Sequence, residues 1–288
     1  MQKYAIPDLF FSYIIYFIMM KDFDKTKNLL IFGDNLKALE QLKDVGAKDQ
    51  IDFIYIDPPY FTGSDYSQYQ DKWDSMEDYL AMLNERFLLM KELLSPTGCI
   101  AVHLDWHAVH YVKVEMDRIF GYNHFVNELI WSYKSGGAST RNFARKHDNI
   151  LVYSKSSKHK FNPQKEKSYN RGGKPYRFKG VEEFSDEKGW YTLVNHKDVF
   201  TIDMVGRTSA ERTGYPTQKP EKLMDLLIEA FTDEGDLCAD FFAGSGSLAA
   251  AAAKKNRRYI SCDDSGESIE VQAKRLTDAG SIFELIEA

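Results

Sequence analysis

A short apolar run that ends in two consecutive prolines constrains the fold of this chain more than any other feature. Ile51–Ile56 reads Ile-Asp-Phe-Ile-Tyr-Ile and is followed directly by Asp57-Pro58-Pro59-Tyr60. A run this short and apolar predicts a β-strand that is buried on both faces, as in parallel sheets. The proline rings keep the preceding backbone extended, so the strand cannot continue as a helix. Ligands of open α/β sheets bind beyond the carboxyl ends of such strands, which predicts that Asp57 lies in a crevice.

The residues after this strand suit chemistry on a flat amino group. The exocyclic amine of adenine or cytosine is a poor nucleophile because its lone pair is delocalised into the ring. The Asp57 carboxylate and the Pro58 carbonyl could accept its two N–H groups where positive charge develops. Tyr60 offers a stacking surface to a base that has left the duplex. A proline turn in which Asp57 only caps the loop explains the tetrapeptide equally well.

A second motif has the pattern of a strand, a glycine turn and a helix. Residues 237–242 form an apolar run, Ala243-Gly244-Ser245-Gly246-Ser247 follows, and residues 248–255 favour a helix. Both glycines allow positive φ and close backbone approach, and the helix amino terminus offers unpaired N–H groups to a carboxylate. A dinucleotide pyrophosphate would use similar geometry. Asp263, after the strand-like run 258–262, would hold ribose hydroxyls in either case.

Together, these motifs resemble the DNA amino-methyltransferases that use S-adenosylmethionine, specifically their β class. In that class the catalytic motif precedes the cofactor motif, and a target-recognition segment lies between them. Gly33-Asp34-Asn35 and Tyr215-Pro216-Thr217-Gln218-Lys219-Pro220 extend the resemblance, which covers residues 29–276. Residues 57–153 are most similar to the modification subunits of type III restriction-modification systems, although this chain is shorter than those subunits.

The resemblance implies a reaction and a set of functional residues. The expected reaction is methyl transfer from S-adenosylmethionine to N6 of a flipped-out adenine at a specific DNA site. The initial Asp57 favours adenine, cytosine N4 is the alternative target, and a non-catalytic DNA-binding relic is a third interpretation. The implied catalytic residues are Asp57, Pro58 and Tyr60. The implied cofactor-binding residues are Asp34, Thr217, Lys219, Asp240, Phe242, Gly244, Gly246 and Asp263.

The chain departs from the pattern of this family at four positions. Phe241 stands where the family usually has Pro, Leu248 where it has Thr, Asp263 where it has Glu, and Tyr215 where it often has His. Asp263 is followed by Asp264, and we expect Asp263 to be the ribose ligand of the two. None of these departures removes a catalytic group.

Positive charge is concentrated between the two motifs. The whole chain has a net charge of -6, but residues 134–179 contain 13 Lys and Arg against two acidic residues, a net charge of +11. An isolated basic run is usually a solvated surface. Its place between the two motifs, with aromatic residues interleaved, instead predicts contacts with the phosphates of double-stranded DNA. The candidate DNA-binding residues are Lys134, Arg141, Arg145, Lys146, Arg171, Lys174 and Arg177.

Strands that alternate with helices predict an α/β fold with a mostly parallel sheet and helices on both faces. The resemblance makes this a Rossmann-like methyltransferase fold of permuted motif order with an inserted target-recognition lobe. We expect a catalytic half over 24–133, a basic target-recognition insert over 134–213 and a cofactor-binding half over 214–288. The polar and aromatic residues 61–75, which include Tyr66, Tyr69 and Trp73, are expected to form a lid over the pocket.

The amino terminus is an extension over 1–23. Residues 9–20 are almost all apolar, but the run is too short to span a membrane and lacks the features of a signal peptide. We expect Met19 or Met20 to be the natural start, and a helix packed on the core is the alternative.

The remaining residues that could bind metal or form disulfides are expected to be structural. His103, His107 and His110 provide too few ligands on one face for a zinc site, and Asp105 could contact substrate or cap the next helix. Cys99, Cys238 and Cys262 each lie in an apolar run, which indicates reduced core residues and a cytoplasmic protein. The resemblance leaves a cognate restriction endonuclease and a homodimer open as partners.

Overall fold

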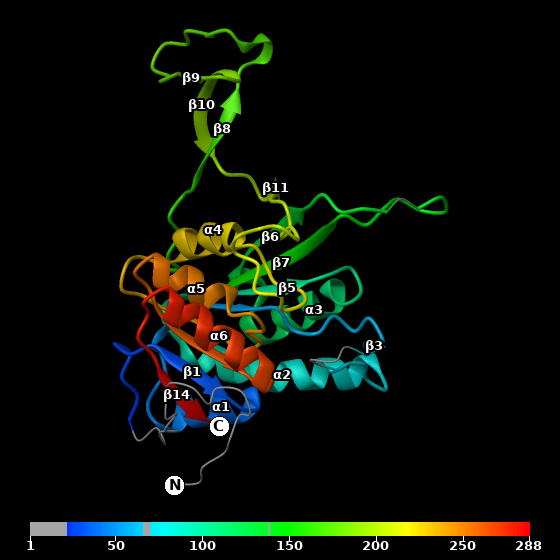
Figure 1. The fold of residues 1–288 in the computed structure, drawn as a ribbon, viewed down its shortest axis with the longest axis vertical. Helices are drawn as coiled ribbons and strands as arrows, with labels where there is room; N and C mark the ends of the chain where they lie inside the picture. Colours follow the sequence, from blue (N-terminus) through cyan, green and yellow to red (C-terminus); the bar gives the residue numbers. More distant parts are fainter. Residues whose placement is uncertain (1–21, 66–69, 138) are drawn as a thin grey trace.

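A central sheet organises the computed structural model, which describes residues 22–65, 70–137 and 139–288 (Figure 1). Within these residues, its strands in chain order are β1 (Leu29–Phe32), β2 (Ile51–Ile56), β5 (Leu94–Leu104), β6 (Phe125–Ser132), β7 (His147–Ser154), β11 (Val199–Thr201), β12 (Leu237–Asp240), β13 (Arg258–Asp263) and β14 (Glu284–Glu287). The helices are α1 (Asn35–Asp44), α2 (Met76–Leu93), α3 (Val109–Phe120), α4 (Glu221–Phe231), α5 (Ser247–Lys254) and α6 (Gly266–Asp278).

The strand order confirms the predicted α/β fold. The order is β11-β6-β7-β5-β2-β12-β13-β1-β14. Neighbouring strands pair in parallel, except that β7 is antiparallel to both β5 and β6. A mostly parallel sheet of this kind requires a helical crossover between strands and therefore a helical layer on each face.

The β2 strand shows how the sequence produces these two layers. Its side chains alternate between the faces, so Ile54 and Ile56 pack in the core with α1, α2 and α3. Phe53 and Tyr55 point to the other face, where α4, α5 and the end of α6 cover them. The ring of Phe53 stacks on that of Phe231 from α4, with centroids 5.6 Å apart. Burial on both faces is the reason that residues 51–56 are almost uniformly apolar.

The sheet brings together two motifs that are far apart in the sequence. In the pairing of β12 with β2, Cys238 lies opposite Phe53 and Ala239 opposite Ile54. The strands are parallel, so the loops after their carboxyl ends emerge at the same edge. On the far side of β12, the parallel strands β13 and β1 carry their own carboxyl ends to this edge. Ligand sites in open α/β sheets form at such an edge.

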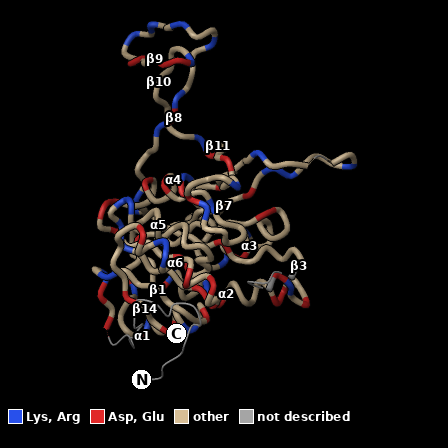
Figure 2. The backbone as a smooth tube through the Cα atoms, in the orientation of Figure 1, with Lys and Arg blue, Asp and Glu red and all other residues tan. Residues whose placement is uncertain are grey.

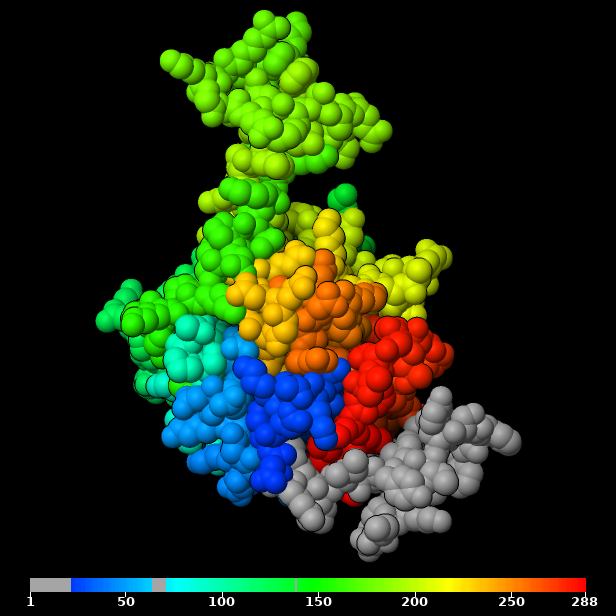
Figure 3. Space-filling view, turned by 90° about the vertical axis from the view of Figure 1, so that its left-hand side faces the viewer, coloured from blue at the N-terminus to red at the C-terminus, as the bar shows by residue number. Residues whose placement is uncertain are grey.

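The basic insert predicted over 134–213 forms two separate projections, because β7 returns from it into the buried central sheet. The first projection, called the arm, comprises residues 133–137 and 139–146 between β6 and β7 (Figure 1). The second, called the lobe, comprises residues 163–198 and contains the antiparallel strands β8 (Lys165–Tyr169), β10 (Gly189–Asn195) and β9 (Phe184–Asp186). Figure 3 shows the lobe standing clear of the body on a narrow neck.

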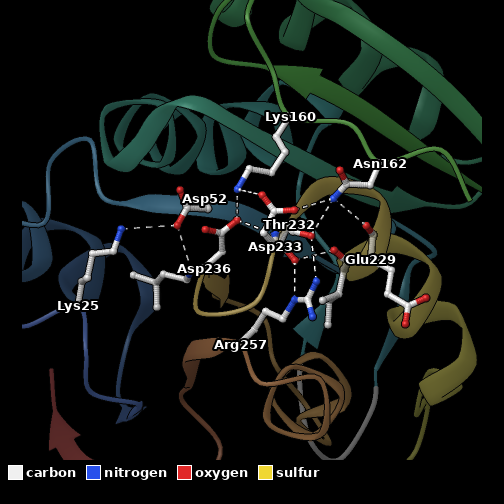
Figure 4. Close-up of polar contacts among 11 residues, drawn as sticks. Lys25, Asp52, Lys160, Asn162, Glu229, Thr232, Asp233, Asp236 and Arg257 are labelled. Carbon is white, nitrogen blue, oxygen red and sulfur yellow. Dashed lines mark hydrogen bonds and ion pairs between the residues drawn. The ribbon is translucent and has the colours of Figure 1, made fainter.

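A group of polar contacts fixes the chain that leads into the lobe (Figure 4). The side-chain amide of Asn162 donates to the Thr232 carbonyl at 3.1 Å and to the Asp233 carboxylate at 3.0 Å. The ammonium of Lys160 pairs with Asp233 at 2.9 Å and also with Asp236. The neck of the lobe is therefore fastened to the loop between α4 and β12.

The expectations for the amino terminus fall mostly on residues 1–21, which lie outside the described residues. Phe23, which is described, packs against the core and donates its N–H to the Val45 carbonyl at 3.0 Å. In the part of the chain that is described, no helix has the length and apolar character needed to cross a membrane. Cys99, Cys238 and Cys262 are buried free thiols, as predicted.

Candidate active site

One cavity of about 360 Å³ opens at the carboxyl edge of the sheet, and residues of both motifs line it. This volume lies within the range of small-molecule sites in proteins. The predicted catalytic residues that line it are Asp57, Pro58 and Tyr60, and the predicted cofactor residues are Asp34, Thr217, Lys219, Asp240, Phe242, Gly244 and Asp263. Gly246 does not belong to this lining. The fold thus brings together all but one of the predicted catalytic and cofactor residues.

Side chains bind both carboxylate oxygens of Asp57. The Tyr60 hydroxyl donates to Oδ1, and the Lys219 ammonium donates to Oδ2. The loop itself is held by Tyr79 of α2, whose hydroxyl donates to the Pro59 carbonyl at 2.8 Å. Burial and the neighbouring Asp57 charge raise the pKa of Tyr60 well above its usual value, so its hydroxyl keeps the proton that it donates. Asp57 is therefore positioned by side chains and does not act as a simple loop cap.

The predicted lid over 61–75 is anchored by a buried carboxylate. Asp71 accepts the backbone N–H of Phe61 at 2.6 Å and that of Thr62 at 3.1 Å. Trp73 lines the cavity and packs edge-on against Tyr79, with ring centroids 4.9 Å apart. Tyr66 and Tyr69 lie outside the described residues. Closure of this segment over the pocket stays a prediction.

A buried network lies beneath the ring of Tyr60. That ring stacks on His103, with centroids 6.2 Å apart and planes at 26°. His103 Nδ1 lies 2.7 Å from the Tyr55 hydroxyl and Nε2 lies 3.1 Å from the Asp148 carboxylate, which also accepts the Tyr133 hydroxyl at 3.0 Å. Burial acts to raise the pKa of Asp148, but the bonds from His103 and Tyr133 outweigh it and leave this pKa below its usual value. The network fixes the surface on which Tyr60 rests.

The other two histidines considered above have different environments. His107 donates its backbone N–H to Asp105 Oδ1 at 2.8 Å, and its Nδ1 lies 2.7 Å from Oδ2 of the same carboxylate. The Asp105 carbonyl accepts the N–H of Val109, the first residue of α3, at 3.1 Å. His110 is exposed on α3. The Asp105 carboxylate thus binds His107 in the turn before α3 and does not cap the helix, whose N-cap is Ala108 with no side-chain hydrogen bond, so the predicted capping role is wrong.

Asp263 holds the glycine turn between β12 and α5. Its Oδ2 accepts the N–H of Gly244 at 2.8 Å, and its Oδ1 accepts the N–H of Ser265 at 3.0 Å. Burial raises the pKa of Asp263 to about 6, although these two bonds act to lower it. Burial likewise raises the pKa of Asp240, which accepts the Phe242 N–H at 3.0 Å, well above its usual value. The turn and two carboxyl groups form one wall of the cavity.

The two glycines of the turn are required for different reasons. Gly244 has φ +49°, and a Cβ there would lie 3.2 Å from the Tyr215 ring, at the cavity wall. Gly246 has φ +69°, and a Cβ there would lie only 2.8 Å from Cγ of the buried Gln272 in α6. Gly246 thus permits α5 and α6 to pack closely. Gly246 does not line the cavity, and its role in binding the cofactor stays a prediction.

The comparisons with known proteins agree with this geometry. A family model described as DNA methylase matches residues 51–275. Type II methyltransferase M.HpaI from Haemophilus parainfluenzae is 30% identical over 258 residues, which is 90% of this chain and 77% of that protein. DNA adenine methyltransferase YhdJ from Escherichia coli (strain K12) is 25% identical over 262 residues, covering 88% of this chain and 84% of that protein.

This chain belongs to the DNA methylase family. The predicted resemblance to S-adenosylmethionine-dependent DNA amino-methyltransferases is confirmed. Among solved structures, the PvuII DNA methyltransferase (cytosine-N4-specific) superposes on this chain with a TM-score of 0.62 at 16% sequence identity. The superposition covers 86% of this chain and 86% of that one. This likeness confirms the Rossmann-like methyltransferase fold.

Lys219 of this methylase contacts both groups of predicted site residues. The resemblance implied that Lys219 lies among the cofactor residues, and it does line the cavity. Its ammonium, however, is bound to the Asp57 carboxylate of the catalytic loop. Thr217, two residues earlier, lines the cavity with φ +58°. Positive φ is unfavourable for a β-branched residue and is often found at functional sites.

One lining residue of this methylase, Arg86, has no signal in the sequence. Arg86 lies on α2, and its Nε donates to Asn35 Oδ1 at 2.5 Å while its Nη2 lies 3.4 Å from Asp34 Oδ2. Asn35 in turn donates to the Phe241 carbonyl at 2.8 Å. Arg86 thereby links α2 to the start of α1, and Asn35 links the start of α1 to the loop after β12. In the sequence it occupies an ordinary polar position of a helix, so only the fold reveals its place.

The predicted DNA-binding residues of this methylase divide between the two projections (Figure 2). Arg141 is exposed on the arm. The guanidinium of Arg145 stacks on the Trp106 ring at 3.7 Å, and the Lys146 ammonium donates to the Gly136 carbonyl at 2.6 Å and to two atoms of Ser135. Lys146 therefore ties the two sides of the arm together. The other exposed candidates are Lys134 on the arm and Arg171, Lys174 and Arg177 on the lobe.

Proposed function

We propose that this chain transfers a methyl group from S-adenosylmethionine to N6 of an adenine flipped out of double-stranded DNA at specific sites. One observation carries this proposal: the catalytic loop after β2 and the glycine turn after β12 line the same cavity. Chemistry on a base requires the base to leave the stack and enter a pocket of this kind. Membership of the DNA methylase family supports DNA as the substrate.

The cofactor half of the cavity has groups that suit the parts of S-adenosylmethionine. By the resemblance, Asp263 would bind the ribose and Asp34 would face the adenine end. The residues that would line the methionine end are Asp240, Phe242, Gly244 and Gly246. Asp263 is already tied to the Gly244 N–H, so the ribose ligand and the turn are held as one unit. When bound, S-adenosylmethionine supplies the electrophilic methyl group.

The catalytic half has groups that suit the target amine. The Asp57 carboxylate and the Pro58 carbonyl would accept its two N–H groups, and acceptors fixed in advance stabilise the charge that develops on nitrogen. Tyr60 would stack on the base, which offsets part of the cost of unstacking it from the duplex. The His103 network beneath Tyr60 holds this surface in place.

The choice of adenine rests on the catalytic motif, which begins with Asp57. Enzymes of this kind that modify cytosine N4 more often begin the motif with Ser. The relative YhdJ is named an adenine methyltransferase, whereas the PvuII enzyme with the same fold is cytosine-N4-specific. Cytosine N4 is therefore the second candidate.

We further propose that the arm and the lobe bind the DNA. Both project from the body (Figure 2). The exposed residues on them include Lys134 and Arg141 on the arm and Arg171 on the lobe. The arm begins where β6 ends and returns to the body at the start of β7. In the pairing of β7 with β5, Asn149 lies opposite Leu104, at the carboxyl end of β5. That end lies at the same edge as the end of β2 and its catalytic loop. Phosphates bound by the arm would therefore lie beside the cavity.

The test is to incubate unmethylated DNA with the protein and labelled S-adenosylmethionine, digest the DNA and identify the labelled nucleoside. We expect N6-methyladenine from the unaltered protein and no label with Asp57→Ala, because the acceptor of the amine is lost. S-adenosylhomocysteine should bind Asp57→Ala nearly as well as the unaltered protein. Detection of labelled N4-methylcytosine would show that the target is cytosine N4 and not adenine N6. DNA that carries no label would refute the proposal. Sequencing the modified DNA would then identify the recognition site.

A further inference from the structure

Lys219 reaches from the cofactor-binding half into the catalytic loop. Its ammonium pairs with Oδ2 of Asp57 and lies 5.7 Å from the centroid of the Tyr60 ring. Only 12% of the Lys219 side chain and 18% of the Asp57 side chain are exposed. An ion pair with so little exposure is weakly screened by solvent, unlike pairs on the protein surface. This contact therefore has a strong influence on the orientation of Asp57.

The backbone of Lys219 is held from the cofactor side. Its carbonyl accepts the Ser247 hydroxyl at 2.8 Å, and Ser247 is the first residue of α5, directly after the glycine turn. Pro220 follows Lys219 and precedes the first turn of α4, where its fixed φ is favourable. The side chain thus projects from a point fixed by the starts of α4 and α5. Its reach to Asp57 depends on how the two halves pack.

The orientation of the Asp57 carboxylate determines whether it can accept a hydrogen bond from the target amine. A carboxylate that rotates freely must be ordered during the reaction, whereas one fixed in advance requires no reorganisation. Two bonds fix this one: the Tyr60 hydroxyl on Oδ1 and the Lys219 ammonium on Oδ2. An ionised carboxylate can accept about four hydrogen bonds, so one donor on each oxygen leaves room for the amine.

We propose that Lys219 is a positioning residue that orients Asp57 for the target amine and does not bind the cofactor. The inference rests on the proposed function, because it assigns Lys219 a role in that reaction. The cofactor-binding half, in this arrangement, supplies the cation that completes the catalytic half. The Asp57 carboxylate is oriented to accept a hydrogen bond from the target amine only when the two halves are packed together.

The experiment compares Lys219→Met, Lys219→Gln and Lys219→Arg with the unaltered protein. Lys222→Met is the matched control, because Lys222 is an exposed lysine three residues later on α4. The measurements are kcat and KM on DNA that contains the mapped site, the Kd for S-adenosylhomocysteine by calorimetry, and the thermal unfolding midpoint.

We expect both neutral variants to lower kcat by roughly 30-fold or more, because the loss falls on a prearranged acceptor. Their affinity for S-adenosylhomocysteine should stay within about twofold of the unaltered protein, since a residue that acts through Asp57 leaves cofactor binding unchanged. Lys219→Arg keeps the charge and should be several-fold more active than Lys219→Met. Lys222→Met should match the unaltered protein.

Three results would overturn the inference while leaving the proposed function intact. One is unchanged kcat in the neutral variants, and another is the same kcat for Lys219→Arg and Lys219→Met. The third is a tenfold or greater loss of S-adenosylhomocysteine affinity in both neutral variants, which would assign Lys219 to the cofactor or to the fold. An unaltered protein that methylates no DNA would instead refute the proposed function itself.

Discussion

The imidazole of His103 lies 3.1 Å from the carboxylate of Asp148 in the interior of the sheet. This contact joins β5 to β7, and the other ring nitrogen of His103 joins β5 to Tyr55 on β2. The same ring supports Tyr60, which would stack on the target base. A polar network in the core thus connects Tyr60 with the strand that follows the arm.

We expect His103→Phe to destabilise the protein by about 3 kcal/mol or more, because it leaves the largely buried Asp148 carboxylate without its main partner. Urea unfolding would measure this loss. His110→Phe makes the same substitution at an exposed position of α3 and should change the unfolding free energy little. Equal effects of the two substitutions would show that the network contributes nothing to stability.

Gly246→Ala should destabilise the protein more than Gly280→Ala. The two glycines have nearly the same backbone conformation, with φ +69° and φ +71°. The backbone strain of alanine at positive φ, roughly 1 kcal/mol, is therefore common to both substitutions. Only Gly246 has a neighbour within 4 Å of the added Cβ, namely Gln272 at 2.8 Å. Thermal unfolding of the two variants would separate the steric contact from the strain.

The affinity for S-adenosylhomocysteine should fall as the pH drops through about 6, the value to which burial raises the pKa of Asp263. Above this pH the carboxylate is ionised and accepts ribose hydroxyls strongly, whereas below it the group is protonated and accepts them weakly. A charged hydrogen bond contributes about 1.5–3 kcal/mol, so we expect a loss of roughly tenfold or more. Calorimetry across this range would measure it. The variant Asp263→Asn cannot titrate at this position, so it should bind S-adenosylhomocysteine weakly and with an affinity that does not change with pH. If its affinity depended on pH as steeply as that of the unaltered protein, Asp263 would not be the ribose ligand.

Arg141→Ala should weaken DNA binding and reduce its salt dependence. Each phosphate contact contributes about -0.9 to the slope of log K against log salt concentration, so the loss of one contact should make the slope shallower by about this amount. Lys274→Ala is the control, because Lys274 is an exposed lysine on α6, outside the arm and the lobe. Binding isotherms at several salt concentrations would give both slopes. The same slope for Arg141→Ala and the unaltered protein would place the DNA away from this part of the arm.

The parts of the fold that could be predicted are those with strong local signals. The strand 51–56 matches its predicted bounds, and the strand-like run 258–262 lies within β13 (Arg258–Asp263). Fully buried strands and proline or glycine stops are visible in a short window of sequence. The meeting of the two motifs in one cavity also follows from a simple rule, because ligands bind at the carboxyl ends of parallel strands.

The parts that could not be predicted depend on contacts between distant residues. The resemblance placed Lys219 near the cofactor, and only the structure shows that its side chain also reaches Asp57. The close approach of Gly246 to Gln272 of α6 is likewise visible only in the structure. The basic insert was predicted as one unit, and the return of β7 into the sheet divides it. Sequence patterns contain no direct signal for any of these three relationships.

The narrow neck of the lobe has a consequence for how relatives of this protein can diverge. Residues 163–198 leave and rejoin the body through two chain segments, and the contacts of Lys160 and Asn162 fasten the first of these outside the lobe itself. A segment attached in this way can be exchanged for another of different length or shape without repacking the central sheet. Because we propose that the lobe binds the DNA, we expect that grafting the corresponding segment of another methylase onto this neck yields a hybrid with new sequence preference and unchanged chemistry.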